Sequence, residues 1–334
     1  MQKLFWIGSP FFSDSLTDCG WEVCACNFND IQVFTWQGIV QKAGWEPDVV
    51  VVADKSRPPF VLGMEEFPCI TIFYAVDTHI HSWYPLYGQA FDACMVSLKD
   101  DIPTFLDKRL PESRVWWFPP FARNDDLPVP GVTPIWDCLF VGSVNDTMPK
   151  RKAFLERVGK LVPGLQVMQG NYRNLYPQAK IVLNQSEHGD LNFRVFEAMG
   201  CGRCLITPRV GHDLVHMFVD GEHTVMYEPD NAEDVAAKVE FLLDDMELTE
   251  YIAEQGRLAI DAGHRASHRA QSLTDMLCDI WMNDPQMLIQ ERLAQAAAIR
   301  EQYLRMPYLL LAEQMPYPQL QAAYLAAANG TYTG

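Results

Sequence analysis

The chain has 334 residues, of which 49% are hydrophobic and 21% charged, and its formal net charge is −17. This length and composition describe a soluble globular protein with room for two domains, and they exclude a fibrous or disordered chain. The negative charge argues against nucleic acid as a partner, because phosphate backbones are bound by cationic surfaces. A small anionic ligand is not excluded, since it needs only a local group of donors and cations.

The sequence lacks the usual signs of a membrane or secreted protein. No stretch approaches the roughly 20 apolar residues that span a bilayer, so no transmembrane segment is expected. The first residues, MQKLFWIGSP, are too short for the apolar core of a signal peptide and favour a first β-strand. The nine cysteines are an odd number scattered along the chain, which favours reduced thiols and a cytoplasmic location.

The first 118 residues alternate short β-branched or aromatic runs with helical stretches. Some runs, such as the four valines at 49–52, are apolar at consecutive positions, which suits a strand buried on both faces of a parallel sheet. The pattern predicts a βαβ series. Its expected strands are Leu4–Ile7, Trp21–Phe28, Asp48–Ala53, Cys69–Tyr74, Ala93–Ser97 and Arg114–Phe118.

A second βα series follows a stretch with five prolines between Pro119 and Pro134. Its expected strands are Trp136–Val141, Leu165–Met168, Lys180–Asn184, Cys204–Thr207 and Thr224–Tyr227. Its expected helices are Pro149–Lys160, Leu191–Met199, Asp213–Phe218, Ala232–Leu243, Glu247–Ile260 and Arg265–Trp281.

These patterns predict an α/β protein with two Rossmann-like domains facing a cleft and a helical C-terminal extension. The expected boundaries are an N-terminal domain at 1–120, a linker at 121–134, a second domain at 135–283 and the extension at 284–334. The extension is expected to pack on the body of the protein or on a second copy, which would make a homo-oligomer.

The segment Lys180–Pro208, KIVLNQSEHGDLNFRVFEAMGCGRCLITP, carries the clearest chemical signal. A strand ends there, a polar loop follows, and a helix is expected to begin near Leu191. Such a turn presents free backbone N–H groups and the positive end of a helix dipole, which together suit a pyrophosphate. Its candidate binding residues are Asn184, Gly189, Asp190, Leu191 and Asn192.

Arg194 and Glu197 lie three residues apart, on one face of the same expected helix. Arg194 is suited to neutralise phosphate charge, and Glu197 to accept two hydrogen bonds from the vicinal hydroxyls of a ribose. The alternative is an exposed Arg–Glu pair on an amphipathic helix.

Three runs, LNFRVFEAMGCGRCLITPRVG, FVDGEHTVMYEPDNAEDVAAKVEFLLDD and AEQGRLAI, resemble the C-terminal domain of GT-B glycosyltransferases, in particular the spore-maturation-type (group 1-like) family. The resemblance covers roughly Trp136–Leu277 and implies that Glu197, in the "FEA" helix, binds the nucleotide ribose. Many retaining members carry another glutamate eight residues earlier, where this chain has Gly189. Asp190 stands beside that position and Glu187 two residues before it, so a retaining or inverting outcome stays open.

The resemblance also implies a basic residue facing the donor pyrophosphate. Arg151 is the candidate, in the Lys-Arg-Lys run that follows Gly142 and its neighbouring serine. The alternative is a basic helix turn in solvent. Lys180 is a further candidate near the nucleotide.

Two features of the N-terminal half follow expected strands. Gly8 and Ser9 come after the first strand, where a glycine lets the backbone approach a ligand. Asp77, His79 and His81 come after Cys69–Tyr74, and loops at the carboxyl ends of parallel strands line the ligand crevice.

An aspartate or histidine in that loop could deprotonate an acceptor hydroxyl, and the resembled enzymes carry a similar Asp-x-His stretch facing the cleft. The alternative is a capping aspartate with two loop histidines that have no role. No further ligands have a suitable spacing to make a metal site with these histidines, so no metal is expected.

Taken together, the resemblance implies a metal-independent glycosyltransferase without a cofactor, whose co-substrate is a nucleotide diphosphate sugar. Its acceptor would be a hydroxyl or similar nucleophile of a carbohydrate, a protein or a small molecule. Two alternatives stay open, a non-catalytic GT-B relic that acts as a binding module and a nucleotide-sugar epimerase or phosphorylase.

Overall fold

The computed structural model describes residues 1–28 and 32–332. The chain divides into two compact units, one formed by Met1–Pro119 with Ala270–Gly334 and the other by Pro120–Arg269. We call them unit 1 and unit 2. Among the described residues, no helix combines the length and the apolarity that crossing a bilayer requires.

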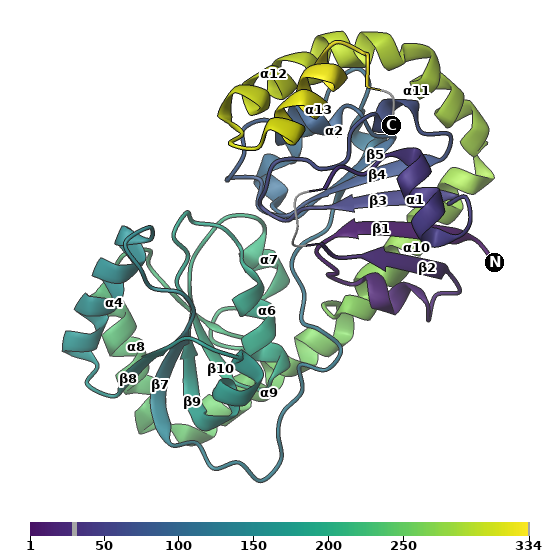
Figure 1. The fold of residues 1–334 in the computed structure, drawn as a ribbon. Coiled ribbons are helices and arrows are strands. Elements are labelled where there is room, and N and C mark those ends of the chain that lie inside the picture. Colours follow the sequence, from purple (N-terminus) through teal and green to yellow (C-terminus); the bar gives the residue numbers. More distant parts are fainter. Residues whose placement is uncertain (29–31, 333–334) are drawn as a thin grey trace. The chain divides into compact units, whose positions relative to one another are not determined.

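Unit 1 is built on a parallel six-stranded sheet with the strand order β2-β1-β3-β4-β5-β6 (Figure 1). The valines predicted to be buried on both faces of the sheet are buried in β3. The strands are Lys3–Gly8 (β1), Glu22–Cys26 (β2), Val49–Ala53 (β3), Ile70–Ala75 (β4), Ala93–Val96 (β5) and Val115–Trp117 (β6). The helices between them are Trp36–Ala43 (α1), Tyr84–Gly88 (α2) and Ile102–Phe105 (α3).

Unit 2 is built on a parallel five-stranded sheet with the order β11-β10-β9-β7-β8. Its strands are Trp136–Val141 (β7), Leu165–Met168 (β8), Ala179–Leu183 (β9), Cys204–Pro208 (β10) and Val225–Tyr227 (β11). Its helices are Pro149–Leu161 (α4), Tyr172–Leu175 (α5), Phe193–Gly200 (α6), Leu214–Met217 (α7), Ala232–Asp244 (α8) and Met246–Gly263 (α9).

The boundary between the units differs from the expected one. Helix α10 (Ala266–Met282) begins in unit 2 and continues into unit 1. In unit 1, Trp21 donates from Nε1 to Thr274 Oγ1 at 3.0 Å, and its ring lies 5.9 Å from that of Trp281. Unit 2 therefore ends at Arg269 rather than at 283, because most of α10 packs on unit 1. The expected linker at 121–134 likewise groups with unit 2.

The C-terminal extension is part of the core of unit 1. Its helices are Pro285–Ile299 (α11), Arg305–Gln314 (α12) and Pro318–Ala328 (α13), with a π-helical segment at Arg300–Leu304. Figure 1 shows them, in green to yellow, lying along the unit that the first strands form. The side chains that they add to the core of unit 1 include Ile299, Leu304, Tyr308, Leu311, Leu320 and Tyr324.

A buried ion pair fixes α11 to the sheet of unit 1. Arg292 and Asp92 are fully buried and lie 2.9 Å apart, from Nε to Oδ1. The remaining nitrogens of Arg292 donate to the carbonyls of Met64, Phe67 and Cys69, so the buried charge is fully hydrogen-bonded. The extension thus packs on its own chain, and oligomerisation through it stays a prediction.

Candidate functional site

Arg194 ties helix α6 to the carboxyl edge of the unit 2 sheet. Its Nε donates to the carbonyl of Val141 at 2.9 Å, at the end of β7. Its Nη1 donates to Asn184 Oδ1 at 2.7 Å and to the carbonyl of Gln185 at 3.2 Å, just after β9. A Cβ on Gly142 would lie 2.6 Å from Arg194 Nη2, so a side chain at this position would displace the guanidinium that lies against it.

Arg151, in the first turn of α4, brings a second guanidinium to the same edge. Its Nε donates to Gln185 Oε1 at 2.8 Å and its Nη1 to the carbonyl of Ser143 at 3.1 Å. The guanidinium carbons of Arg194 and Arg151 lie 4.7 and 5.8 Å from the centre of the Phe140 ring. Burial, and then the charge of Arg194, lower the pKa of Arg151. Two guanidiniums gathered in this way form a site that favours a multiply charged anion such as a diphosphate.

The acidic side chains of the loop after β9 are engaged within unit 2. The carboxylate of Glu187 accepts from the backbone N–H groups of Lys150 and Arg151 at 3.1 and 2.8 Å, and so caps α4. Asp190 accepts a hydrogen bond from Ser186 Oγ. Gly189 has a φ of 79°, which a glycine adopts without strain.

Helix α6 begins two residues later than expected. Leu191 is buried and Asn192 is the N-cap residue in extended backbone, so the first helical residue is Phe193. Any contact of Leu191 with a ligand would therefore come from its backbone.

A pocket of about 360 Å³ opens beside this loop. It lies past the carboxyl ends of β9, β10 and β11, where open α/β sheets bind ligands. Residues that line it include Phe154, Gln185, Gly189, Arg209 and Tyr227.

Glu197, on α6, carries the electrostatic signature of a binding residue. Burial, and secondly the negative charge of Asp126, raise the pKa of its carboxyl to about 7. The positive charges of Arg194, Arg123 and Arg173 act in the opposite direction. Within residues 1–28 and 32–332, no donor makes a hydrogen bond to this carboxylate. Such a group is suited to accept hydrogen bonds from a ligand.

Lys180 does not join this group. It is the second residue of β9, at the amino end of the strand, and its Nζ lies 2.6 Å from Asp137 Oδ1 at the start of β7. Asn184 follows the other end of β9, where its Nδ2 donates to Thr207 Oγ1 at 3.0 Å. The prediction for Lys180 is therefore corrected, because the strand separates its ammonium from the arginine pair and Asp137 compensates its charge.

The glycine after the first strand has a packing role. Gly8 has a φ of 112°, and a Cβ on it would lie 2.0 Å from the carbonyl oxygen of Ala53, its partner on β3. The carbonyl of Ser9 accepts from Trp6 Nε1 at 2.7 Å. Close approach of two strands accounts for Gly8, and the predicted approach to a ligand is not needed to explain it.

A buried aspartate that sequence reasoning missed holds the loop after β4. Asp54 is 6% exposed and follows the valine run of β3. Its Oδ2 accepts from the backbone N–H groups of Val76 and Asp77 at 3.2 and 2.9 Å, and its Oδ1 from the hydroxyl of Tyr84. The only signal in the sequence is an aspartate directly after a strand buried on both faces. Ser56 Oγ donates to the carboxylate of Asp77 itself.

The two candidate histidines of this loop have different surroundings. His79 is exposed, whereas the ring of His81 stacks on Trp83 with centroids 5.1 Å apart. The Nε2 of His81 is enclosed and has no hydrogen-bond partner among the described residues. No group of three or more His, Cys, Asp or Glu side chains suited to hold a metal ion occurs in the described part of the chain.

Comparison with known proteins identifies the fold. A model of the family described as "Glycosyl transferase-like" matches residues 134–275, which is most of unit 2. No curated protein sequence matches the chain.

Sucrose-phosphate synthase from Thermosynechococcus elongatus is similar in structure, with 13% identity and a TM-score of 0.60 over 85% of this chain and 100% of the other. A glycosyltransferase from Rickettsia africae has 10% identity and a TM-score of 0.60 over 85% and 99% of the two chains. HepE from Anabaena, in complex with UDP and glucose, has 12% identity and a TM-score of 0.60 over 84% and 100%.

The protein therefore has the GT-B fold, as the resemblance in its sequence implied. The segment that carries Glu197 and the arginine pair lies within the residues that match the glycosyl transferase-like model.

Proposed function

We propose that the protein is a metal-independent glycosyltransferase that moves a sugar from a nucleotide diphosphate sugar to an acceptor hydroxyl or similar nucleophile. The observation that carries the proposal is Glu197, whose raised pKa and unbonded carboxylate lie on the helix that Arg194 anchors. The match of residues 134–275 to a glycosyl transferase-like family and the UDP-glucose complex of the structurally similar HepE support this class of donor.

In unit 2, Glu197 would accept hydrogen bonds from both ribose hydroxyls, which compensates the cost of ionising it in a half-buried position. The diphosphate would lie beside Arg151 and Arg194 and the backbone N–H groups at the start of α6. When the bond between sugar and diphosphate breaks, negative charge builds up on the departing phosphate. Preorganised guanidiniums stabilise that charge in the transition state, and no metal ion is required for this task.

In unit 1, we assign the activation of the acceptor to Asp77 and His79, with His81 as the lesser candidate. A general base must come within hydrogen-bonding distance of the hydroxyl that it deprotonates, or act through one water. Asp54 supports the assignment, because its bonds to the N–H of Asp77 and to Tyr84 fix the loop in place.

Calorimetric titration with UDP, ADP and GDP in the presence of EDTA tests the donor site. The loss of two hydrogen bonds to a carboxylate, each contributing roughly 1.5–3 kcal/mol, should weaken binding to Glu197→Ala by at least about tenfold. The matched control is Glu240→Ala, an exposed glutamate on α8 of the same unit. Equal affinity of both variants and the native protein for the nucleotide that binds would contradict the role of Glu197.

Turnover distinguishes the alternatives. A transferase releases nucleoside diphosphate from the donor when an acceptor is present. A GT-B relic would bind nucleotide and release no diphosphate with any acceptor, and an epimerase would convert the sugar without one.

A further inference from the structure

The chain passes between the two units twice, after Pro119 and after Arg269, and the two passages are bound to each other within unit 2. Ala122 N donates to the carbonyl of His264, and Ala266 N donates to the carbonyl of Ala122, both at 2.9 Å. Arg269 Nη2 donates to the carbonyl of Pro120 at 3.1 Å. We call residues 120–128 the connecting segment.

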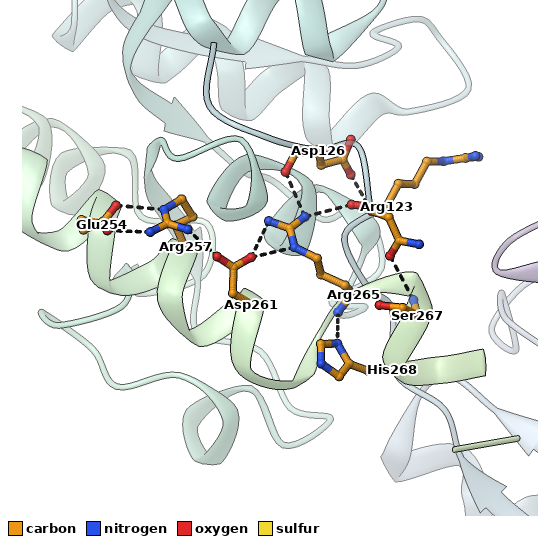
Figure 2. A network of polar contacts seen from close by, with 9 residues as sticks. Arg123, Asp126, Glu254, Arg257, Asp261, Arg265, Ser267 and His268 are labelled. Carbon is orange, nitrogen blue, oxygen red and sulfur yellow. Dashed lines mark hydrogen bonds and ion pairs between the residues drawn. The ribbon is translucent and has the colours of Figure 1, made fainter. Parts of the chain in front are cut away.

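Arg265, at the start of α10, secures the connecting segment to the end of α9 (Figure 2). Its Nη1 donates to the carbonyls of Arg123 and Asp126, each at 2.9 Å. Its Nε donates to Asp261 Oδ1 at 2.7 Å, and Asp261 in turn pairs with Arg257 on α9. Arg265 thus holds the connecting segment at two carbonyls.

The carboxylate of Asp126 links this segment to the loop between β8 and β9. Its side chain is fully buried, and its Oδ2 accepts from the backbone N–H of Arg123 at 2.7 Å. Its Oδ1 accepts from the hydroxyl of Tyr172 at 2.8 Å and from Arg173 Nε at 2.6 Å. A buried carboxylate whose hydrogen bonds are satisfied in this way restricts the positions of the groups that donate to it.

The connecting segment also lies directly against helix α6. A Cβ on Gly200 would lie 2.8 Å from the Cβ of Ala122 and 3.3 Å from the carbonyl oxygen of Asp126. A Cβ on Gly202 would lie 2.8 Å from Cγ of Pro128. Close contact with the connecting segment therefore explains Gly200, and Gly202 combines such a contact with a φ of 68°, which a glycine adopts without strain.

We propose that Asp126 is a positioning residue of the nucleotide site, which holds the connecting segment and helix α5 against the helix carrying Glu197. Nucleotide binding at Glu197 and order in the connecting segment are then coupled. This inference rests on the proposed function for the ligand, but the contacts of Asp126 do not depend on it. Because coupling is reciprocal, a ligand that fixes Glu197 stabilises the connecting segment, and a change that loosens the segment weakens the binding of the ligand.

The electrostatic environment of Glu197 includes the charge of Asp126. Asp126 is the main negative charge that disfavours its ionised form. The other titratable groups that face it come from α6 and the turn after it, from α5 and the residue next to it, and from the connecting segment. They are Arg194, Cys201, Tyr172, Arg173, Tyr176 and Arg123. Removing the charge of Asp126 should therefore make Glu197 ionise at a lower pH.

The test compares Asp126→Asn with Asp125→Asn. Asp125 is the adjacent residue and pairs with the same Arg173, but its side chain is 71% exposed. Three quantities are measured. The first is the pKa of Glu197 in the nucleotide-free protein, by carboxylate ¹³C NMR, with Glu197→Gln to assign the signal. The others are the hydrogen–deuterium exchange of residues 120–128 without UDP-glucose and its protection when UDP-glucose is present.

Asp126→Asn should lower the pKa of Glu197, speed exchange of the connecting segment at least about tenfold and abolish its protection by UDP-glucose. Asp125→Asn should leave all three nearly unchanged. An unchanged pKa of Glu197 together with native exchange of residues 120–128 in Asp126→Asn would overturn the proposal. The pKa is the discriminating measurement, because a merely structural contact would not move the titration of Glu197.

If Asp126→Asn does not fold, Tyr172→Phe removes one hydrogen bond from the same carboxylate. It should speed exchange of residues 120–128 a few-fold, and native exchange in this variant would also overturn the proposal. A native protein that binds no UDP-glucose would count against this donor in the proposed function. The pKa and the nucleotide-free exchange rates would still decide the role of Asp126.

Discussion

Glu197→Gln should stabilise the protein at alkaline pH while it weakens nucleotide binding. In the folded state burial and Asp126 raise the pKa of Glu197 to about 7, compared with 4.5 in a solvated carboxyl. The folded protein therefore keeps a proton there that the unfolded chain loses near pH 4.5. Stability falls as the pH rises from 4.5 to 7, and the full cost is present above pH 7.

The size of this cost follows from the shift. A shift of one pKa unit corresponds to 1.36 kcal/mol, so the difference for Glu197 is roughly 3 kcal/mol. Glutamine has nearly the same shape and no charge. Glu197→Gln should therefore unfold like the native protein near pH 4.5 and be up to about 3 kcal/mol more stable at pH 8.

Thermal unfolding of the two proteins in matched buffers at pH 5 and pH 8 measures this difference. We expect the variant to melt several degrees higher at pH 8 and only slightly higher at pH 5. Glu240→Gln, an exposed change on α8, is the control for a general effect of charge. A stability difference for Glu197→Gln that is the same at both pH values would refute the reasoning.

Three further predictions follow, two for the donor site and one for the loop of Asp77 and His79 in unit 1. UDP-glucose should bind about tenfold more tightly at pH 8 than at pH 6, because ribose hydroxyls favour the ionised Glu197. Calorimetry at the two pH values measures this, and equal affinities would contradict the contact between Glu197 and the ribose. Gly142→Ala should displace the guanidinium of Arg194 and weaken UDP-glucose binding by at least about tenfold at an unchanged fold, so native affinity in this variant contradicts a role of Arg194. Substitution of Asp77 or His79 should slow single-turnover transfer about 100-fold while donor affinity stays native, and loss of donor affinity instead would place this loop in the donor site.

The central strands of both sheets were predictable from the sequence, because a strand buried on both faces needs consecutive apolar residues. The four valines of β3 are the clearest example. Which unit a helix packs on was not predictable in the same way. Helix α10 has an ordinary amphipathic pattern, and its attachment to unit 1 depends on contacts such as that of Trp21 with Thr274, which are distant in sequence.

That Arg194 and Glu197 lie on one helix was predictable, because spacing along the sequence decides it, and their contact with a ligand stays a prediction. The candidate site was not predictable where long-range hydrogen bonds decide the geometry, as for Asp126 and its contact with Tyr172. The placement of Lys180 was predictable, because a residue at the amino end of a parallel strand lies at the edge opposite to the ligand site.

A crystal structure of the complex with UDP, ADP or GDP, whichever binds most tightly in calorimetry, tests the central claim most directly. The account predicts both ribose hydroxyls within hydrogen-bonding distance of the Glu197 carboxylate and the phosphates beside Arg151 and Arg194, with no metal ion between them. A nucleotide bound away from Glu197, or phosphates held by a divalent metal, would contradict it.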